Sequence, residues 1–327
     1  MEIFAGTSGF SYAEWKGRFY PHALPDAQML DFYASRLPSV EINNTFYRMP
    51  KAETVAAWRD EVPAGFCFAV KATRRITHQQ KLADVSADVA HLFSVVDVLG
   101  DKLGVVLFQL PPFLKKDLGL LSAFLSDLPP GRRAALEFRH PSWFADDVYS
   151  ALAGRNVALV AGDLEEAEKS PPLVATADFG YLRLRRLDYD PRAIAEWGER
   201  IQAQRWQAAY TYFKHELLGP MFAEALLANL GGQPMADLSA IRASIAAPSQ
   251  KPKSARTTAS KSKKPEPRVS KAPAERVSKA PAESVPKAPV VRVSKAPAAR
   301  VSKAPASRTS KAPASPSSKP AGKPRRP

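Results

Sequence analysis

Short apolar segments recur along the first 245 residues, and polar or glycine-containing stretches separate them. Several segments, such as GVVLFQL, FCFAV and ALVAG, are apolar at nearly every position. Parallel strands that are covered on both faces have this composition, and the spacing is typical of βα units rather than of a β-sandwich. We therefore predict eight parallel strands, at Ile3–Thr7, Val40–Thr45, Phe66–Ala72, Gly104–Leu110, Ala134–Arg139, Ala158–Asp163, Tyr181–Arg185 and Ala208–Lys214.

Helical periodicity marks most of the segments between these strands. One apolar helical face consists of Met29, Leu30, Tyr33, Ala34 and Leu37. A second consists of Val89, Leu92, Phe93, Val96 and Leu99. Further helices are predicted at Pro191–Gln204, with Asp190 as the N-cap, and at Met221–Leu230. The stretch Leu164–Gly180 contains a Pro-Pro pair and fits no ten-residue helix, so we expect an irregular sixth crossover.

These elements predict an α/β fold, a TIM-type (β/α)8 barrel in residues 1–245. An open, doubly wound sheet is the alternative, because the alternation of strands and helices does not show whether the sheet closes.

Charge is distributed very unevenly along the chain. The net charge of the 327 residues is +15, yet residues 246–327 hold 21 Lys and Arg against 3 Glu, a net of +18. Residues 1–245 therefore carry 26 basic and 29 acidic side chains, a net of −3. The basic segment has no aromatic residue and contains half of the 30 prolines. It cannot bury enough apolar surface to offset the entropy of ordering it, so we predict a disordered tail.

The basic tail contains an eight-residue repeat. The units read RVSKAPAE, RVSKAPAE, SVPKAPVV, RVSKAPAA, RVSKAPAS and RTSKAPAS, and begin at Arg268, Arg276, Ser284, Arg292, Arg300 and Arg308. A proline in each unit prevents a continuous helix and favours extended segments. Such repeats resemble the tails of histone H1-like bacterial proteins. Flexible cations bind polyanions by releasing counterions, so nucleic acid is the partner expected for residues 246–327. A passive solubilising extension or a tail that binds acidic proteins are the alternatives.

The remaining composition indicates a soluble cytoplasmic protein, with association with the nucleoid through the tail. The sequence begins MEIFAGTSGF, without the apolar run of a secretory signal, and no segment has the length needed to span a membrane. The single cysteine, Cys67, lies in an apolar run and is expected to pack in the core rather than to react.

Five segments follow one another in a characteristic order. They are GTSGFSYAEWKGRFYP from Gly6, VEINNTFYRMP from Val40, FAVKATRRITH from Phe68, DKLGVVLFQLPP from Asp101 and LEFRHPSW from Leu136. In these segments the chain resembles the YecE-like proteins, also called domain of unknown function 72, over about residues 3–230. The resemblance implies a TIM-barrel-like fold, in agreement with the strand count, and implies no established reaction.

Two strand ends depart from the pattern of that family. Where the family typically has Tyr-x-Arg-x-His-Gly on the seventh strand, this chain has YLRLRRLDY from Tyr181. Where the family has Tyr-Phe-Asn-Asn-Asp on the last strand, this chain has YFKHE from Tyr212. A mechanism shared by the whole family is therefore in doubt for this chain.

Polar side chains gather at the carboxyl ends of the predicted strands, which is where barrel enzymes build their active sites. These residues are Thr7, Ser8, Glu41, Asn43, Asn44, Lys71, Gln109, Glu137, Arg139, His140, Asp163, Arg183, Arg185, Lys214 and His215. Residues two apart on a strand share a face, so Glu41 is expected beside Asn43, and Glu137 beside Arg139.

We interpret these strand ends as an acid–base site for an anionic, phosphate- or carboxylate-bearing substrate. The catalytic candidates are Glu41, Lys71, Glu137 and Asp163, with Glu41 or Glu137 as proton acceptor and Lys71 as proton donor or electrostatic stabiliser. Arg139 and Arg183 would hold the anion. The other substrate-binding candidates are Ser8, Asn43, Gln109, His140 and Lys214. No cofactor is assigned.

Two alternatives remain for the same residues. In the first, Glu41, Lys71, Glu137 and Arg139 form a structural ion-pair network that plugs the barrel, and the protein is a non-catalytic ligand-binding or nucleic-acid-associated scaffold. In the second, Glu41, Glu137, His140, Asp163 and His215 bind a divalent metal. No short metal-binding signature is present, so no metal site is assigned.

Two loops are candidate substrate gates. Gly9–Pro21 carries Tyr12 and Trp15 among other aromatics, and Thr73–Lys81 carries Thr77 and His78 among basic residues. Aromatic and basic groups together could stack on the bases of single-stranded nucleic acid. The alternative is a satellite hydrophobic cluster that covers the mouth of the barrel.

Overall fold

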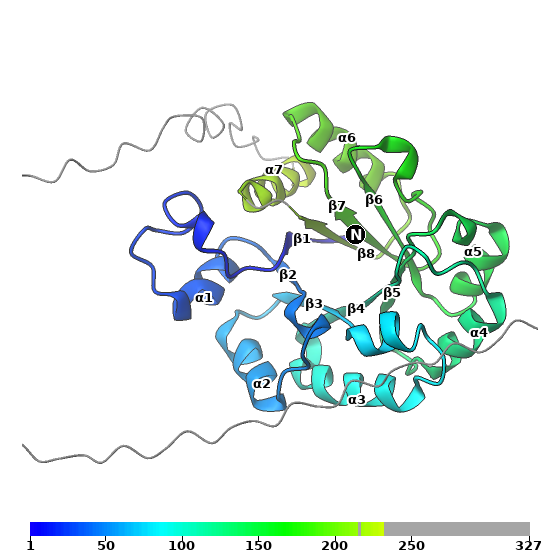
Figure 1. The fold of residues 1–327 in the computed structure, drawn as a ribbon. Helices are drawn as coiled ribbons and strands as arrows, with labels where there is room; N and C mark the ends of the chain where they lie inside the picture. The colour runs from blue at the N-terminus through cyan, green and yellow to red at the C-terminus, as the bar shows by residue number, and fades with distance from the viewer. Residues whose placement is uncertain (215–216, 232–327) are drawn as a thin grey trace, which may run out of the picture. The chain divides into compact units, whose positions relative to one another are not determined.

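The computed structural model describes residues 1–214 and 217–231, which form a closed barrel of eight parallel strands. The strands are β1 (Glu2–Ser8), β2 (Ser39–Ile42), β3 (Cys67–Lys71), β4 (Leu103–Gln109), β5 (Ala134–Glu137), β6 (Ala158–Asp163), β7 (Phe179–Leu184) and β8 (Ala208–Phe213). The α-helices are α1 (Met29–Ala34), α2 (Ala52–Glu61), α3 (Ser86–Val96), α4 (Leu118–Asp127), α5 (Asp146–Ala153), α6 (Pro191–Gln202) and α7 (Gly219–Leu230). Figure 1 shows the strands at the centre and the helices around them.

The predicted (β/α)8 barrel is confirmed, and the open sheet is excluded because β1 pairs in parallel with both β2 and β8. Six predicted strands extend past the observed carboxyl ends, four of them (β3, β4, β7 and β8) by one residue and two of them further. β2 stops at Ile42, because Asn44–Phe46 turns into a 3-10 helix instead of continuing to pair. β5 stops at Glu137, two residues before the predicted end.

Alternate residues of each strand fill the inside of the barrel. The inner apolar cluster contains Cys67, Ala69, Val105, Leu107, Ala135, Ala158, Val160, Phe179, Tyr181, Ala208, Tyr210 and Tyr212. Cys67 is buried there, and burial raises the pKa of its thiol to about 12, so the predicted role in core packing fits its environment. With its lower layers filled, the barrel is a packed core rather than a channel, and chemistry is confined to its carboxyl-terminal end.

A second, larger core lies between the strands and the helices. In α6 the residues Ile194, Trp197 and Ile201 are buried, at the spacing of one helical face. The side chain of Asp190 accepts a hydrogen bond from the Ala193 amide at 2.7 Å, so the predicted N-cap is confirmed. The last α-helix begins at Gly219, two residues earlier than predicted, with Pro220 in its first turn.

The crossover between β6 and β7 differs from the others. Within it only Ala167–Lys169 is helical, as a single 3-10 turn, so the irregular sixth crossover expected from the sequence is confirmed. The hydroxyl of Ser170 accepts a hydrogen bond from the Leu164 amide at 2.9 Å and closes the loop. The barrel therefore lacks a covering α-helix at this position.

None of the helices in residues 1–214 and 217–231 is both long and apolar enough to cross a membrane. The predicted domain boundary after residue 245, the repeats of the basic tail and His215 lie outside the described residues.

Candidate functional site

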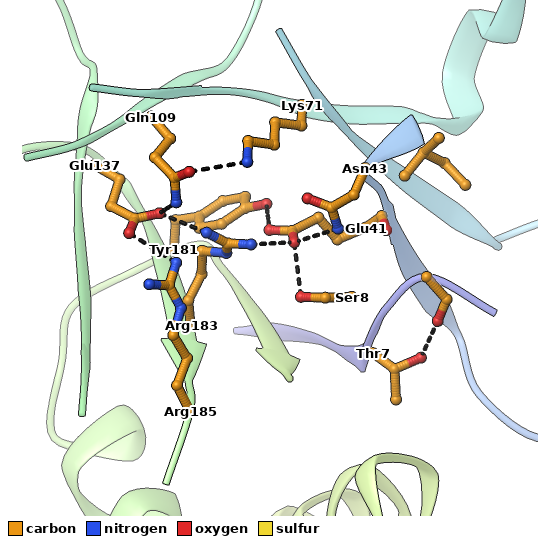
Figure 2. A network of polar contacts seen from close by, with 12 residues as sticks. Thr7, Ser8, Glu41, Asn43, Lys71, Gln109, Glu137, Tyr181, Arg183 and Arg185 are labelled. Carbon is orange, nitrogen blue, oxygen red and sulfur yellow. Dashed lines mark hydrogen bonds and ion pairs between the residues drawn. The ribbon is translucent and has the colours of Figure 1, made fainter. Parts of the chain in front are cut away.

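The alternation of strand residues builds one polar layer at the carboxyl-terminal end of the barrel. Six strands each contribute an inward side chain that is buried: Ser8, Glu41, Lys71, Gln109, Glu137 and Arg183. Figure 2 shows these side chains pointing toward one another from opposite sides of the barrel. β6 contributes no side chain, because a Cβ at Gly162 would lie 2.2 Å from the carbonyl oxygen of Arg183. All six of these side chains are among the strand-end residues that the sequence predicted to lie together.

Glu41 is fully buried and makes four hydrogen bonds. Its Oε1 accepts from Ser8 Oγ at 2.7 Å, from Asn43 Nδ2 at 2.8 Å and from Arg183 Nη2 at 2.8 Å. Its Oε2 accepts from the Tyr181 hydroxyl at 2.7 Å. Each carboxylate oxygen is thus occupied by protein donors, which fixes the orientation of Glu41.

Three arginines converge on Glu137. Oε2 accepts from Arg183 Nη1 at 2.6 Å, and Oε1 accepts from Arg185 Nη2 at 2.7 Å and from Arg139 Nε at 3.3 Å. Oε2 also accepts from Gln109 Nε2 at 2.7 Å. Arg183 therefore bridges the two buried carboxylates, as Figure 2 shows.

The arginines determine the charge state of both carboxylates. Burial would raise the pKa of Glu137, but Arg183, Arg185 and Arg139 outweigh burial and hold it well below its ordinary value. For Glu41, burial is likewise opposed by Arg183 and by hydrogen bonds, and its pKa is lowered. Both groups are therefore anions at neutral pH. They are poor proton donors and weak bases in this state.

Lys71 differs from the other charged groups in the layer. Its Nζ donates to Gln109 Oε1 at 2.9 Å and lies 4.3 Å from the centre of the Phe46 ring. In the part of the chain that the structure describes, no carboxylate oxygen lies within 4.0 Å of this amine. Burial, together with the nearby Arg183, lowers its pKa to about 8. Lys71 is thus the group in this layer whose proton is exchangeable near neutral pH.

The charges of the layer do not balance. Lys71, Arg139, Arg183 and Arg185 supply four positive charges against the two carboxylates, which leaves an excess of two. In addition, Nε of Arg183 and Nε of Arg185 are buried without a hydrogen-bond partner among the described residues. An unpaired buried donor costs about 1–3 kcal/mol. Buried polar groups without a partner are uncommon in folded proteins, so these two Nε atoms distinguish the network from a fully satisfied structural plug.

A cavity of about 510 Å³ opens beside this layer, at the carboxyl ends of β5, β6 and β7. Asp163, Glu168 and Lys169 line it, together with four residues of the polar network, Glu137, Arg139, Arg183 and Arg185. Arg139 is the most accessible of these four, since 38% of its side-chain surface is exposed. A ligand in the cavity can therefore reach the guanidinium group of Arg139.

Asp163 lines the same cavity but is not part of the buried network. It follows the inward-facing Gly162 and contacts groups on the outer side of the strand. Its Oδ1 accepts from the Tyr189 hydroxyl and, at 3.1 Å, from the Arg185 amide, and its Oδ2 accepts from Trp197 Nε1 at 3.0 Å. The structure thus places this catalytic candidate where it anchors the β7–α6 loop.

The structure separates Tyr12, Trp15 and Lys214 from the arginine cavity. They line another cavity, of about 400 Å³, together with Ser8. Trp15 is 1% exposed and packs against Tyr12, Phe19 and Tyr20. The first candidate gate therefore has the contacts of a satellite hydrophobic cluster.

Thr77, His78 and His140 have local partners. The hydroxyl of Thr77 lies 2.9 Å from His78 Nδ1, and the His78 ring packs edge-on against Phe46, the ring that Lys71 also contacts. His78 is therefore close to the polar layer, and burial and the charge of Lys71 lower its pKa. His140 Nδ1 accepts from the Ser142 amide at 3.2 Å, which caps the following 3-10 turn.

Within residues 1–214 and 217–231, no three His, Cys, Asp or Glu side chains are grouped closely enough to hold a metal ion. Of the residues in the metal alternative, Glu41 and Glu137 are bound by arginine, while Asp163 and His140 have the separate partners described above.

Tyr181 and Arg185 were not among the residues assigned to the site from sequence, although Arg185 was noted at a strand end. Tyr181 lies two residues before Arg183 on β7, and Arg185 lies two residues after Arg183, directly beyond the end of the strand. This period of two is the signal that could have identified them.

Comparison with known proteins identifies one family over the whole barrel and curated relatives over part of it. Residues 4–244 match the family described as "Protein of unknown function DUF72". The UPF0759 protein YecE of Escherichia coli is 34% identical over 117 residues, which cover 36% of this chain and 43% of YecE. The UPF0759 protein YunF of Bacillus subtilis is 30% identical over 159 residues, which cover 45% of this chain and 54% of YunF. The matched segments thus span about half the length of these curated relatives.

Solved structures show the same fold. A DUF72 family protein from Thermotoga maritima superposes with a TM-score of 0.60 at 22% identity, over 71% of this chain and 100% of that protein. A DUF72 family protein from Enterococcus faecalis gives a TM-score of 0.57 at 19% identity, over 70% of this chain and 95% of that protein.

Proposed function

The chain belongs to the DUF72 family, and we propose that its barrel mouth binds a small anionic substrate and exchanges a proton with it. One observation carries this proposal: four cationic side chains surround two carboxylates that are already fully engaged. A dianion such as phosphate would neutralise the excess charge. It would also supply acceptors for guanidinium groups, whose planar shape matches phosphate and carboxylate oxygens.

The residues have separate roles in this proposal. Arg139 and Arg185 contact the anion, because they reach the cavity with side-chain exposures of 38% and 15%. Glu41 and Glu137 hold Arg183 and Arg185 in place. Lys71 is the proton-exchanging group, since its pKa of about 8 places both of its protonation states within reach at neutral pH.

Calorimetric titration with inorganic phosphate tests the binding step. We expect saturable binding by the full-length chain, and a loss of about tenfold or more on Arg185→Gln, the range for removal of a charged hydrogen bond. Arg205→Gln is a matched control on an exposed arginine outside the cavity. Equal phosphate affinity in the wild type and both variants would contradict the proposal.

Nuclear magnetic resonance of ¹³C-labelled lysine side chains tests the role of Lys71. We expect one lysine, absent from the spectrum of Lys71→Arg, to titrate near pH 8, and its pKa to rise when phosphate is added, because a nearby anion favours the ammonium form. A phosphate-independent titration would place Lys71 away from the anion and favour the alternative function, non-catalytic ligand binding.

A second candidate function, association with nucleic acid, is favoured by the composition of residues 246–327. We propose that this segment tethers the barrel to nucleic acid, including the nucleoid, by electrostatic contacts with little sequence preference. The full chain should bind duplex DNA with a steep salt dependence, and a form ending at Ile245 should bind it far more weakly. Equal binding by the two forms would refute the tether.

A further inference from the structure

The cavity at the ends of β5, β6 and β7 has two chemically different sides. Arg139, Arg183 and Arg185 line it from the strand ends. The lining also includes apolar side chains from the two loops that follow β5 and β6. They are Pro141, Phe144, Leu164 and Pro171.

Part of this apolar lining comes from the sixth crossover, which has no α-helix. Leu164 directly follows β6, and Pro171 follows the 3-10 turn Ala167–Lys169. Leu164 and Phe144 are half-buried, so part of each side chain stays exposed to the cavity. Apolar surface in contact with water is unfavourable by about 25 cal/mol per Å², and a ligand that covered it would recover this free energy.

The size of the cavity argues for a ligand larger than the anion alone. Its volume of about 510 Å³ lies within the range of roughly 300–1,000 Å³ that is typical of small-molecule sites. An inorganic phosphate beside the arginines would leave the apolar side uncovered. A ligand that fills the cavity must therefore join an anionic group to an apolar body.

The anionic group of a ligand in this cavity meets three guanidinium groups, those of Arg139, Arg183 and Arg185. A phosphate monoester carries about −1.5 to −2 at pH 7, whereas a carboxylate carries one charge. A phosphate monoester, which has three terminal oxygens as acceptors, therefore matches three guanidinium groups better than a carboxylate does.

We infer that the ligand of this cavity is a phosphate monoester of an aromatic or aliphatic alcohol. Its phosphate contacts Arg139 and Arg185, and its apolar group lies against Phe144 and Leu164. This inference rests on the anion-binding function proposed above and adds the class of substrate. The apolar side gives affinity without directional contacts, and the arginines fix which end of the ligand faces Glu137.

Calorimetric titration of the full-length chain with three probes tests the inference: inorganic phosphate, 1-naphthyl phosphate and 1-naphthoate. We expect 1-naphthyl phosphate to bind at least about tenfold more tightly than inorganic phosphate, the order expected for burial of one large apolar group. Phe144→Ala and Leu164→Ala should each reduce this advantage severalfold and leave the affinity for inorganic phosphate within about twofold. Tyr47→Ala, which removes a 78% exposed aromatic outside the cavity, should change neither affinity.

The outcomes separate the inference from the proposed function. Equal affinities for inorganic phosphate and 1-naphthyl phosphate would overturn the apolar subsite and leave anion binding intact. Tighter binding of 1-naphthoate than of 1-naphthyl phosphate would overturn the assignment of a phosphate monoester. No binding of any probe by a folded chain, checked by thermal unfolding, would overturn anion binding itself. If one alanine variant does not fold, the other still tests the apolar side.

Discussion

Replacing Lys71 by methionine distinguishes a functional site from a structural plug. In a plug, the lysine would stabilise the fold through ion pairs, and its removal would leave buried carboxylates uncompensated. In the structure Lys71 pairs with no carboxylate among the described residues, and the barrel holds its ammonium in an unfavourable environment. We therefore expect Lys71→Met to stabilise the fold at neutral pH.

The magnitude follows from the contacts of Lys71. A change of its pKa from the ordinary 10.5 to about 8 corresponds to roughly 3 kcal/mol of strain in the protonated form. Methionine relieves this strain but loses the hydrogen bond to Gln109, about 1 kcal/mol, and the contact of the ammonium with Phe46, about 1 kcal/mol. The net gain at pH 7 is of the order of 1 kcal/mol, or roughly 2–4 °C in Tm.

Urea unfolding as a function of pH is the assay, because the sign of the effect depends on pH. The pKa of Lys71 is depressed in the folded state, so the folded chain binds fewer protons than the unfolded chain between about pH 8 and 10.5. The stability of the wild type should therefore gain from Lys71 as the pH rises through this range. Lys71→Met lacks that gain, so its advantage at pH 7 should disappear and reverse near pH 10.5.

Lys115→Met, which changes an exposed lysine in the loop after β4, is the control and should show no such crossover. A loss of more than about 2 kcal/mol in Lys71→Met that stays constant from pH 7 to 10.5 would refute the reasoning. Lys71 would then be a structural member of the network.

Three further predictions concern the carboxylates. Glu137→Gln should lower the free energy of unfolding by about 3–5 kcal/mol in urea, because it leaves three arginines facing a neutral amide, whereas the exposed Glu53→Gln should change little. The pKa values of Glu41 and Glu137 are lowered, so the stabilisation that these carboxylates give is complete above about pH 4.5 and is lost as the pH falls below this value. If the free energy of unfolding of Glu137→Gln fell with decreasing pH as steeply as that of the wild type, this prediction would be contradicted. Asp163→Asn should shift the fluorescence of Trp197, whose Nε1 donates to this carboxylate, and should weaken phosphate binding because the backbone of Arg185 is displaced. An unchanged emission spectrum and an unchanged phosphate affinity would show that Asp163 holds neither Trp197 nor Arg185 in place.

Strand periodicity explains how much of the site could be predicted from sequence. The rule that alternate residues share a face correctly paired Glu41 with Asn43 and Glu137 with Arg139. The same rule, applied to β6, separates Asp163 from this layer, because the preceding Gly162 occupies the inward position. The sequence analysis chose polar residues at strand ends without checking this alternation on β6. It therefore grouped Asp163 with residues that face the interior of the barrel.

The cavity itself could not be predicted from the sequence. Its apolar side comes from loop residues such as Phe144 and Leu164, and loops have no periodicity that indicates which side chains face a neighbour. For the same reason, the sequence of the aromatic loop after β1 did not decide between a substrate gate and the satellite hydrophobic cluster in which Trp15 is buried. The pairing of Arg183 with both carboxylates depends on strand registers across the closed barrel, which one sequence does not specify.

The central claim, that the arginines at the barrel mouth form an anion site, is tested most directly by a crystal of the protein grown or soaked with tungstate, a heavy analogue of phosphate. The account predicts anomalous density in the cavity within hydrogen-bonding distance of Arg139 and Arg185. Density only at other surfaces, with this cavity free of tungstate at a concentration that saturates binding in solution, would contradict it.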